Sequence, residues 1–130
     1  MARDYDASAI PAVHDLQDAP RVRDEPGFEQ TVFRGIDRML GLSWLDPERP
    51  DGEPHTHPYE QTNVLLEGRL DFLVDGERVA LDPHEALTIP PEVSHTARTV
   101  PEESATLLAV WPLREDRLDG TDYQHEFPDL

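Results

Sequence analysis

The strongest constraint on how this chain folds is a hairpin signal near its middle. Residues 69–74 and 77–81 bring apolar side chains to one face at every second position, and Asp75-Gly76 lies between them. Asp-Gly between two such segments is typical of a tight antiparallel hairpin. Other short apolar segments, separated by turn-forming residues, continue to Trp111, and no long segment follows the helical period. We therefore predict an all-β barrel or sandwich of short strands.

A second segment, residues 54–61, carries the chemistry of the chain. In an extended strand, side chains two residues apart lie on the same face, so His55, His57 and Gln61 can converge on one point. His95, from a later segment, is the candidate for a fourth ligand. Imidazole nitrogens with an amide oxygen suit Zn, Ni, Fe or Mn better than Ca or Mg. Such a set leaves positions open for water or substrate, as reactive metal sites do.

The spacing of these residues resembles that of the cupins. The first cupin motif is G-x5-H-x-H-x3,4-E-x6-G, and the positions that match are His55, His57, Gln61 and Gly68. The second motif, G-x5-P-x-G-x2-H-x3-N, is matched at Pro90 and His95. The departures are Arg49, His84 and Glu92 in place of Gly, Gln61 in place of Glu, and Thr99 in place of Asn. The resemblance implies a single-domain double-stranded β-helix, or jelly-roll barrel, with a metal ion inside.

Among cupins, the chain is similar to the KdgF-type pectin-degradation cupins over residues 39–118. The similarity includes residues 54–58, Gln61, residues 64–72 and residues 112–116. Enzymes of that family convert unsaturated uronates, released by polysaccharide lyases, into linear keto forms. The resemblance implies that the metal ligands are His55, His57, Gln61 and His95. It also implies that Arg114 pairs with the substrate carboxylate, while Tyr59 or metal-bound water is the candidate for proton transfer.

Two alternatives to this activity stay open, because the family has an Asp where this chain has Ala109. A carboxylate that could shuttle a proton is missing at that position. One alternative is a non-catalytic cupin that binds a metal or a small ligand without turnover. The other is a metal-dependent dioxygenase, which would require iron and oxygen-dependent turnover.

The charge balance bears on the partners of the chain. It has 28 acidic and 11 basic residues, a formal net charge of −17, and every basic residue is arginine. An acidic surface repels nucleic acid and anionic membrane, so we expect neither as a partner. The neutral ligand Gln61 leaves more positive charge on the metal, which favours a small anionic molecule there. The acidity favours adaptation to a high-salt cytoplasm, where ions screen self-repulsion, and a GC-rich genome is the alternative explanation.

The length of 130 residues predicts one domain. We expect an extended N-terminal arm at residues 1–27, the barrel at residues 28–118 and an acidic tail at residues 119–130. The sequence shows no cysteine, no apolar run long enough to cross a bilayer and no signal segment. We therefore expect a cytoplasmic protein, and the family resemblance implies a homodimer.

Overall fold

The described part of the chain, residues 14–35 and 37–113 of this computed structural model, is built from β-strands and connecting turns. The strands are β1 (Arg21–Glu25), β2 (Phe28–Arg34), β3 (Arg38–Leu45), β4 (Gln61–Gly68), β5 (Leu70–Val74), β6 (Glu77–Leu81), β7 (Ala86–Ile89), β8 (His95–Thr99) and β9 (Ala105–Pro112). Over these ranges the structure has no helix long and apolar enough to cross a membrane. The all-β class predicted from the sequence is confirmed.

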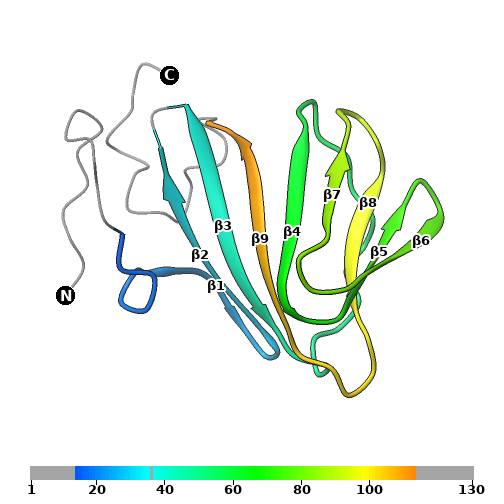
Figure 1. The fold of residues 1–130 in the computed structure, drawn as a ribbon, viewed down its shortest axis with the longest axis horizontal. Helices are drawn as coiled ribbons and strands as arrows, with labels where there is room; N and C mark the ends of the chain where they lie inside the picture. The colour runs from blue at the N-terminus through cyan, green and yellow to red at the C-terminus, as the bar shows by residue number, and fades with distance from the viewer. Residues whose placement is uncertain (1–13, 36, 114–130) are drawn as a thin grey trace.

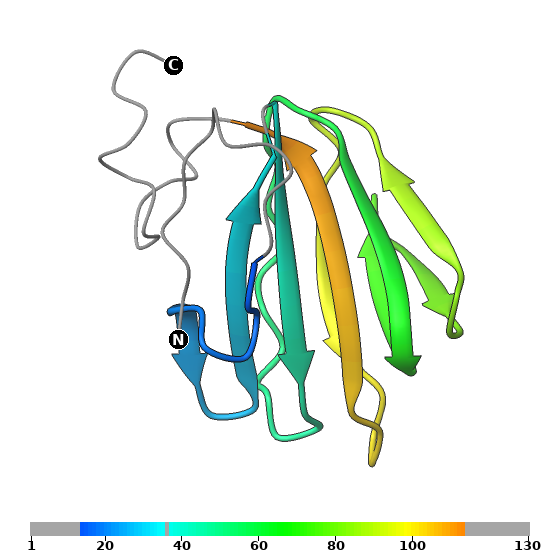
Figure 2. The same ribbon diagram turned by 60° about the vertical axis from the view of Figure 1, so that its left-hand side comes forward.

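The strands form two antiparallel sheets (Figures 1 and 2). The larger sheet has the order β1-β2-β3-β9-β4-β7, and the smaller has the order β6-β5-β8. In both views the smaller sheet lies beside the β4–β7 end of the larger one. Strand β9 lies between β3 and β4 and pairs with both. The large sheet is therefore completed by the strand that comes last among the described residues.

The hairpin predicted at Asp75-Gly76 is present between β5 and β6. Both turn residues have positive φ, 49° for Asp75 and 81° for Gly76, as a type I′ turn requires. The register pairs Leu70 with Leu81, and both side chains are buried. The turn thereby sets which face of the hairpin enters the core.

Alternation along β3 and β9 separates an inner face from an outer face of the larger sheet. Every second residue of β9, from Ala105 to Trp111, is buried, and the residues between them are half-buried. The inner faces contribute to two apolar clusters. The first contains Leu45, Leu65, Leu70, Phe72, Leu81, Ile89, Ala105 and Leu107. The second contains Val32, Met39, Tyr59, Ala109 and Trp111. This second cluster includes three residues that adjoin the site described below.

The N-terminal segment departs from the extended arm expected at residues 1–27. β1 lies inside this segment and pairs with β2, so the larger sheet begins at Arg21. The guanidinium of Arg21 donates to the carbonyls of Leu16 and Ala19 and lies 4.5 Å from the ring centroid of Trp44. The rest of the expected arm (1–13), the last residues of the expected barrel (114–118) and the expected tail (119–130) lie outside the described residues.

Candidate metal centre

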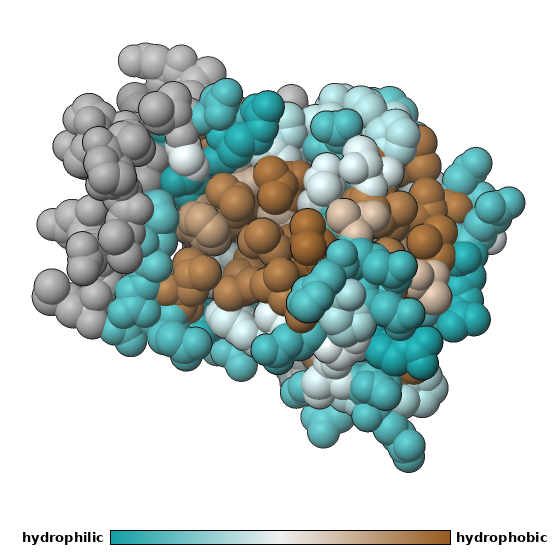
Figure 3. Space-filling view, in the orientation of Figure 1, coloured by the Kyte–Doolittle hydropathy of each residue, from teal (hydrophilic) through white to brown (hydrophobic). Residues whose placement is uncertain are grey.

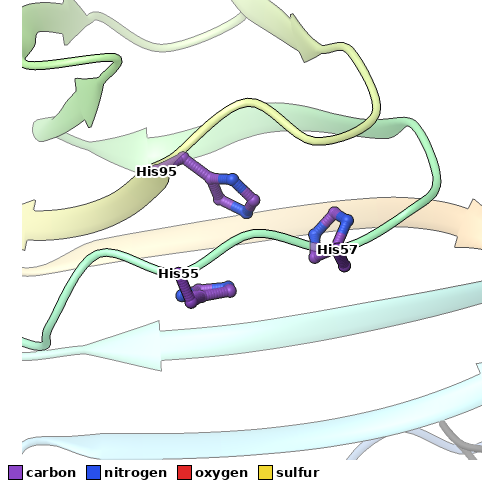
Figure 4. A group of neighbouring side chains, drawn as sticks. All are labelled: His55, His57 and His95. Atoms are coloured by element: carbon purple, nitrogen blue, oxygen red, sulfur yellow. The ribbon is translucent and has the colours of Figure 1, made fainter.

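Three histidines converge where the sequence predicted a metal site. His55 and His57 lie in the loop before β4, and His95 is the first residue of β8 (Figure 4). Ligand nitrogens of the three rings all lie within 4.8 Å of one another. His57 and His95 are buried, and His55 is exposed. The predicted meeting of two histidines from one segment with one from a distant segment is confirmed.

The strand geometry assumed for residues 54–61 is wrong for most of that segment. β4 begins only at its last residue, and the residues before it form a loop with one isolated β-bridge. In this bridge the backbone N–H groups of His55 and His95 each donate to the carbonyl of the other, at 3.0 Å. Pro54 and Pro58 have no N–H to donate, which limits ladder pairing here. The two histidine-bearing segments are therefore joined through the backbone, and strand parity does not position them.

Backbone carbonyls fix the protonation pattern of the two buried imidazoles. His57 Nδ1 donates to the carbonyl of Tyr59 at 2.9 Å, and His95 Nδ1 donates to the carbonyl of Val93 at 2.8 Å. A carbonyl can only accept, so each Nδ1 carries a proton and the neutral ring presents a lone pair at Nε2. Orienting bonds of this kind are typical of histidines that ligate metals. Both rings are thus arranged to offer Nε2 to a cation.

Gln61, predicted as the fourth ligand, approaches the same point. Its Oε1 lies 3.1 Å from His57 Nε2, and its Nε2 donates to Asn63 Oδ1 at 2.9 Å. Asn63 is fully buried and donates from Nδ2 to the carbonyl of Leu87 at 3.5 Å, which orients both amides. With Nδ1 of His57 protonated, two acceptor atoms therefore face each other across 3.1 Å. A cation beside them, or a second proton on the ring, makes that contact favourable.

These donor atoms fit a divalent transition metal. Imidazole nitrogens and an amide oxygen are ligands that Zn, Ni, Fe and Mn accept. Ligand atoms on one ion lie at most about 4.2 Å apart, twice a metal–nitrogen bond of roughly 2.1 Å. The ligand nitrogens of the three rings all lie within 4.8 Å of one another, which is close to that limit.

A cavity of about 210 Å³ opens beside the histidines. Its polar lining includes Gln30, Ser43, His55, Gln61, Asn63 and His95, and its apolar lining includes Phe28, Leu45, Phe72 and Leu107. Arg23 and Arg49 also line it, and none of its described lining residues is a carboxylate. Ala109, where the resembling family has an Asp, faces this cavity from β9. The cavity therefore presents neutral polar and cationic groups, which suit an oxygen-rich anion.

Sequence reasoning missed three contributors to this cavity. Gln30 on β2 donates to the hydroxyl of Ser43 on β3 at 2.9 Å, and both side chains line the cavity. Polar residues at inner positions of otherwise apolar strands were the signal that could have found them. Arg49 is the third, and its place at a motif glycine was noted without a role.

The two residues predicted to be catalytic are placed as follows. Tyr59 is buried, and its ring stacks on His57 with centroids 4.1 Å apart and planes 6° apart. Its side chain packs in the second apolar cluster and is not part of the cavity lining. Tyr59 thus supports His57 from behind, through its ring and its carbonyl. Arg114 lies outside the described residues, so its role stays a prediction.

Two residues that replace motif glycines keep a backbone conformation that favours glycine. His84 has a φ of 72° and Glu92 a φ of 67°, and both side chains are exposed. The N–H of Glu92 donates to the carbonyl of His57 at 2.8 Å. The turn before β8 therefore holds the loop that carries His55 and His57 in place, although the turn lacks the motif glycine.

Comparison with known proteins decides the family. The family model described as "Cupin domain" matches residues 42–111, which is more than half of the chain. The chain belongs to the cupin domain family. The jelly-roll cupin fold predicted from the sequence is thereby confirmed, and the histidine cluster lies within the matched residues.

Two curated proteins and three solved structures show how far the likeness extends. This cupin is 30% identical over 104 residues to "Polyketide synthase CurC" of Streptomyces cyaneus, covering 75% of this chain and 67% of that protein. It is 35% identical over 65 residues to the uncharacterized HTH-type transcriptional regulator YobQ of Bacillus subtilis, covering 50% of this chain but 27% of YobQ.

The solved structures share the fold at lower identity. KdgF from Halomonas sp. has a TM-score of 0.66 and 24% identity, covering 78% of this cupin and 94% of KdgF. The polyketide cyclase RemF from Streptomyces resistomycificus has a TM-score of 0.68 and 23% identity, covering 82% and 81%. An RmlC-like cupin from Shewanella frigidimarina has a TM-score of 0.65 and 23% identity, covering 78% and 90%.

Proposed function

We propose that this cupin binds Zn, Ni, Fe or Mn through His55, His57, His95 and Gln61 and converts a small sugar-acid-like molecule. The reaction we favour is a KdgF-like conversion of an unsaturated uronate to its linear keto form. The observation that carries the proposal is the meeting of His55, His57 and His95, whose ligand nitrogens all lie within 4.8 Å of one another beside a polar cavity. A cation at that point accounts for the arrangement.

A metal bound there would supply a Lewis acid that polarises a hydroxyl or carbonyl oxygen of the substrate. The residues of the chain would bind and orient. Asn63 fixes the amide of Gln61, and the Tyr59 carbonyl fixes the ring of His57. Gln30 and Ser43, which also line the cavity, offer further polar atoms to substrate hydroxyls. We propose Tyr59 as a positioning residue, and Arg114 remains the predicted partner of the substrate carboxylate.

A second candidate is the cyclisation or binding of a small polyketide. It is supported by the 30% identity to CurC and by the apolar lining from Phe28, Leu45, Phe72 and Leu107. Apolar side chains would pack against a ring that carries few hydroxyls. This candidate needs the same metal ligands, so substrate preference and not metal content separates it from the first.

Turnover with defined metals tests the proposal. The protein is stripped of metal, reloaded with each of the four ions, and incubated with an unsaturated galacturonate while its ultraviolet absorbance is followed. We expect one metal equivalent per chain and loss of absorbance in the wild type. His55→Ala should lose both metal and turnover, whereas His84→Ala, in an exposed turn, should keep both. Ligand binding without turnover would indicate a non-catalytic cupin, and oxygen consumption by the iron form would indicate a dioxygenase.

We also propose that this cupin forms a homodimer through the outer face of the larger sheet. Figure 3 shows an apolar area over this sheet. The half-buried side chains on that face are Leu40, Leu42, Trp44, Val64, Leu108 and Val110, with Leu66 at 37% exposure beside them. A chain with a net charge of −17 repels its own copies, and this largely apolar face is where two copies can approach. Light scattering should give twice the chain mass for the wild type and for Glu77→Arg, on the smaller sheet, but a single chain mass for Leu42→Arg.

A further inference from the structure

Arg49 is held rigidly at the rim of the metal cavity. Its Nη1 donates to the carbonyl of Ala97 at 2.9 Å, and its guanidinium carbon lies 5.0 Å from the ring centroid of Phe28. Its Nη2 lies close to Gly52, because a Cβ added to Gly52 would be 3.4 Å from this nitrogen. The same Cβ would lie 3.2 Å from Thr96 Oγ1, next to the ligand His95. The guanidinium is therefore fixed between the loop that carries His55 and the strand that carries His95.

The charge of Arg49 is not neutralised within the described part of the chain. Arg21, Arg23, Arg38, Arg69 and Arg78 each form an ion pair with a carboxylate, and no described carboxylate does so with Arg49. Burial lowers its pKa, while Asp51 and Glu25 at longer range act in the opposite direction. The guanidinium of Arg49 stays charged whichever influence is larger, because arginine is not deprotonated in proteins. In a chain with 28 acidic residues, a half-buried arginine that forms no ion pair with a described carboxylate is a candidate for binding an anion.

The donors of Arg49 that remain are those that a carboxylate uses. A guanidinium has five N–H donors in a planar fork, and one donor of Arg49 is engaged by the Ala97 carbonyl. The cavity that the fork borders is also lined by histidines and amides, and by no described carboxylate. A ligand with an acid group at one end and hydroxyl or carbonyl oxygens at the other would meet both sets of groups.

We propose that Arg49, in the role that the family resemblance gives to Arg114, binds the carboxylate of the cavity's ligand, a small oxygenated acid. This role of Arg49 rests on the proposed function, because that function places the other end of the ligand at the metal. The volume of about 210 Å³ is below the roughly 300–1,000 Å³ of pockets for drug-sized ligands. A cavity of this size suits a sugar acid or a short hydroxy or keto acid.

Calorimetric titration of D-galacturonate and D-galactose, which differ by one carboxylate, tests this role. We expect the zinc-loaded protein to bind galacturonate more tightly than galactose by tenfold or more. Arg49→Gln should weaken galacturonate binding by roughly 10- to 100-fold, the range for hydrogen bonds to charged groups, and leave galactose unchanged. Arg49→Lys should recover part of the loss, because a point charge replaces the planar fork.

Arg23→Gln is the matched control, because Arg23 lines the same cavity but is already paired with Glu25. It should alter galacturonate binding much less than Arg49→Gln does. Metal content and melting temperature are measured for each variant, so a loss of binding can be separated from a loss of metal or of folding. Absence of galacturonate binding, equal affinity for the two sugars, or equal effects of the two variants would overturn the role of Arg49.

Failure of this inference and failure of the proposed function give different results. If galacturonate binding depends on Arg49 but the unsaturated uronate is not turned over, the proposed activity is rejected and the acid-binding role of Arg49 is kept. Turnover with the same KM in wild type and Arg49→Gln keeps the activity and rejects the role. The metal-free protein is titrated in parallel. If it still prefers galacturonate to galactose, and Arg49→Gln removes that preference, Arg49 binds the carboxylate whether or not a metal is bound.

Discussion

Replacing Glu92 with glycine should stabilise this cupin. Glu92 has a φ of 67°, and its exposed side chain leaves the backbone as the main difference from the motif glycine. A left-handed conformation costs an L-residue roughly 1–2 kcal/mol, and the greater freedom of glycine in the unfolded chain offsets roughly 0.5–1 kcal/mol of that. We therefore expect Glu92→Gly to raise the free energy of unfolding by about 0.5–1 kcal/mol, or Tm by about 2–5 °C.

Urea denaturation, followed by the fluorescence of Trp44 and Trp111, measures this change. Glu92→Ala is the matched control, because alanine removes the carboxylate but keeps the strain. Its stability should stay within about 0.5 kcal/mol of wild type, as for a surface substitution. An alanine variant as stable as the glycine variant would refute the reasoning, since the gain would then come from the lost carboxylate. The same pair of substitutions at His84, where φ is 72°, should repeat the result away from the loop that carries His55 and His57.

Three further predictions concern the site and the surface. Asn63→Leu removes the acceptor that orients the Gln61 amide, so it should lower metal affinity about tenfold in a chelator competition. It should also lower the free energy of unfolding by about 1–3 kcal/mol, because Asn63 is buried. Unchanged metal affinity would contradict the orienting role. Zinc at 100 times its Kd should raise the free energy of unfolding by about 2.7 kcal/mol in wild type but not in His57→Ala. Because the imidazoles must lose protons to ligate, this gain should shrink when the melts are repeated at acidic pH. Molar KCl should raise the Tm by screening self-repulsion, and a Tm that does not rise with salt would contradict adaptation to high salt.

The sequence was most informative where local chemistry determines local structure. Asp75-Gly76 specified its turn because few residue pairs accept two positive φ angles, and the β5–β6 hairpin follows from it. The histidines were found because their spacing matches a family motif, although the loop around His55 and His57 is not the strand that was assumed. Three histidines that do lie close together were thus chosen with an incorrect backbone conformation.

Long-range contacts were out of reach for this reasoning. Arg49 contacts Ala97, 48 residues later, and local pattern cannot show that two loops meet at a cavity rim. Tyr59 shares strand parity with the ligands, but the bend of the loop turns its ring against the far side of His57. The inward polar pair of Gln30 and Ser43 depends on the register of β2 with β3, which the sequence leaves open.

The place of β9 between β3 and β4 has a consequence for synthesis on the ribosome. Residues 38–45 and 61–68 emerge early, but each leaves one edge unpaired until residues 105–112 arrive. Non-local pairing of this kind slows folding and leaves strand edges exposed meanwhile. The many carboxylates of the chain repel neighbouring copies, which opposes edge-to-edge pairing until β9 is inserted.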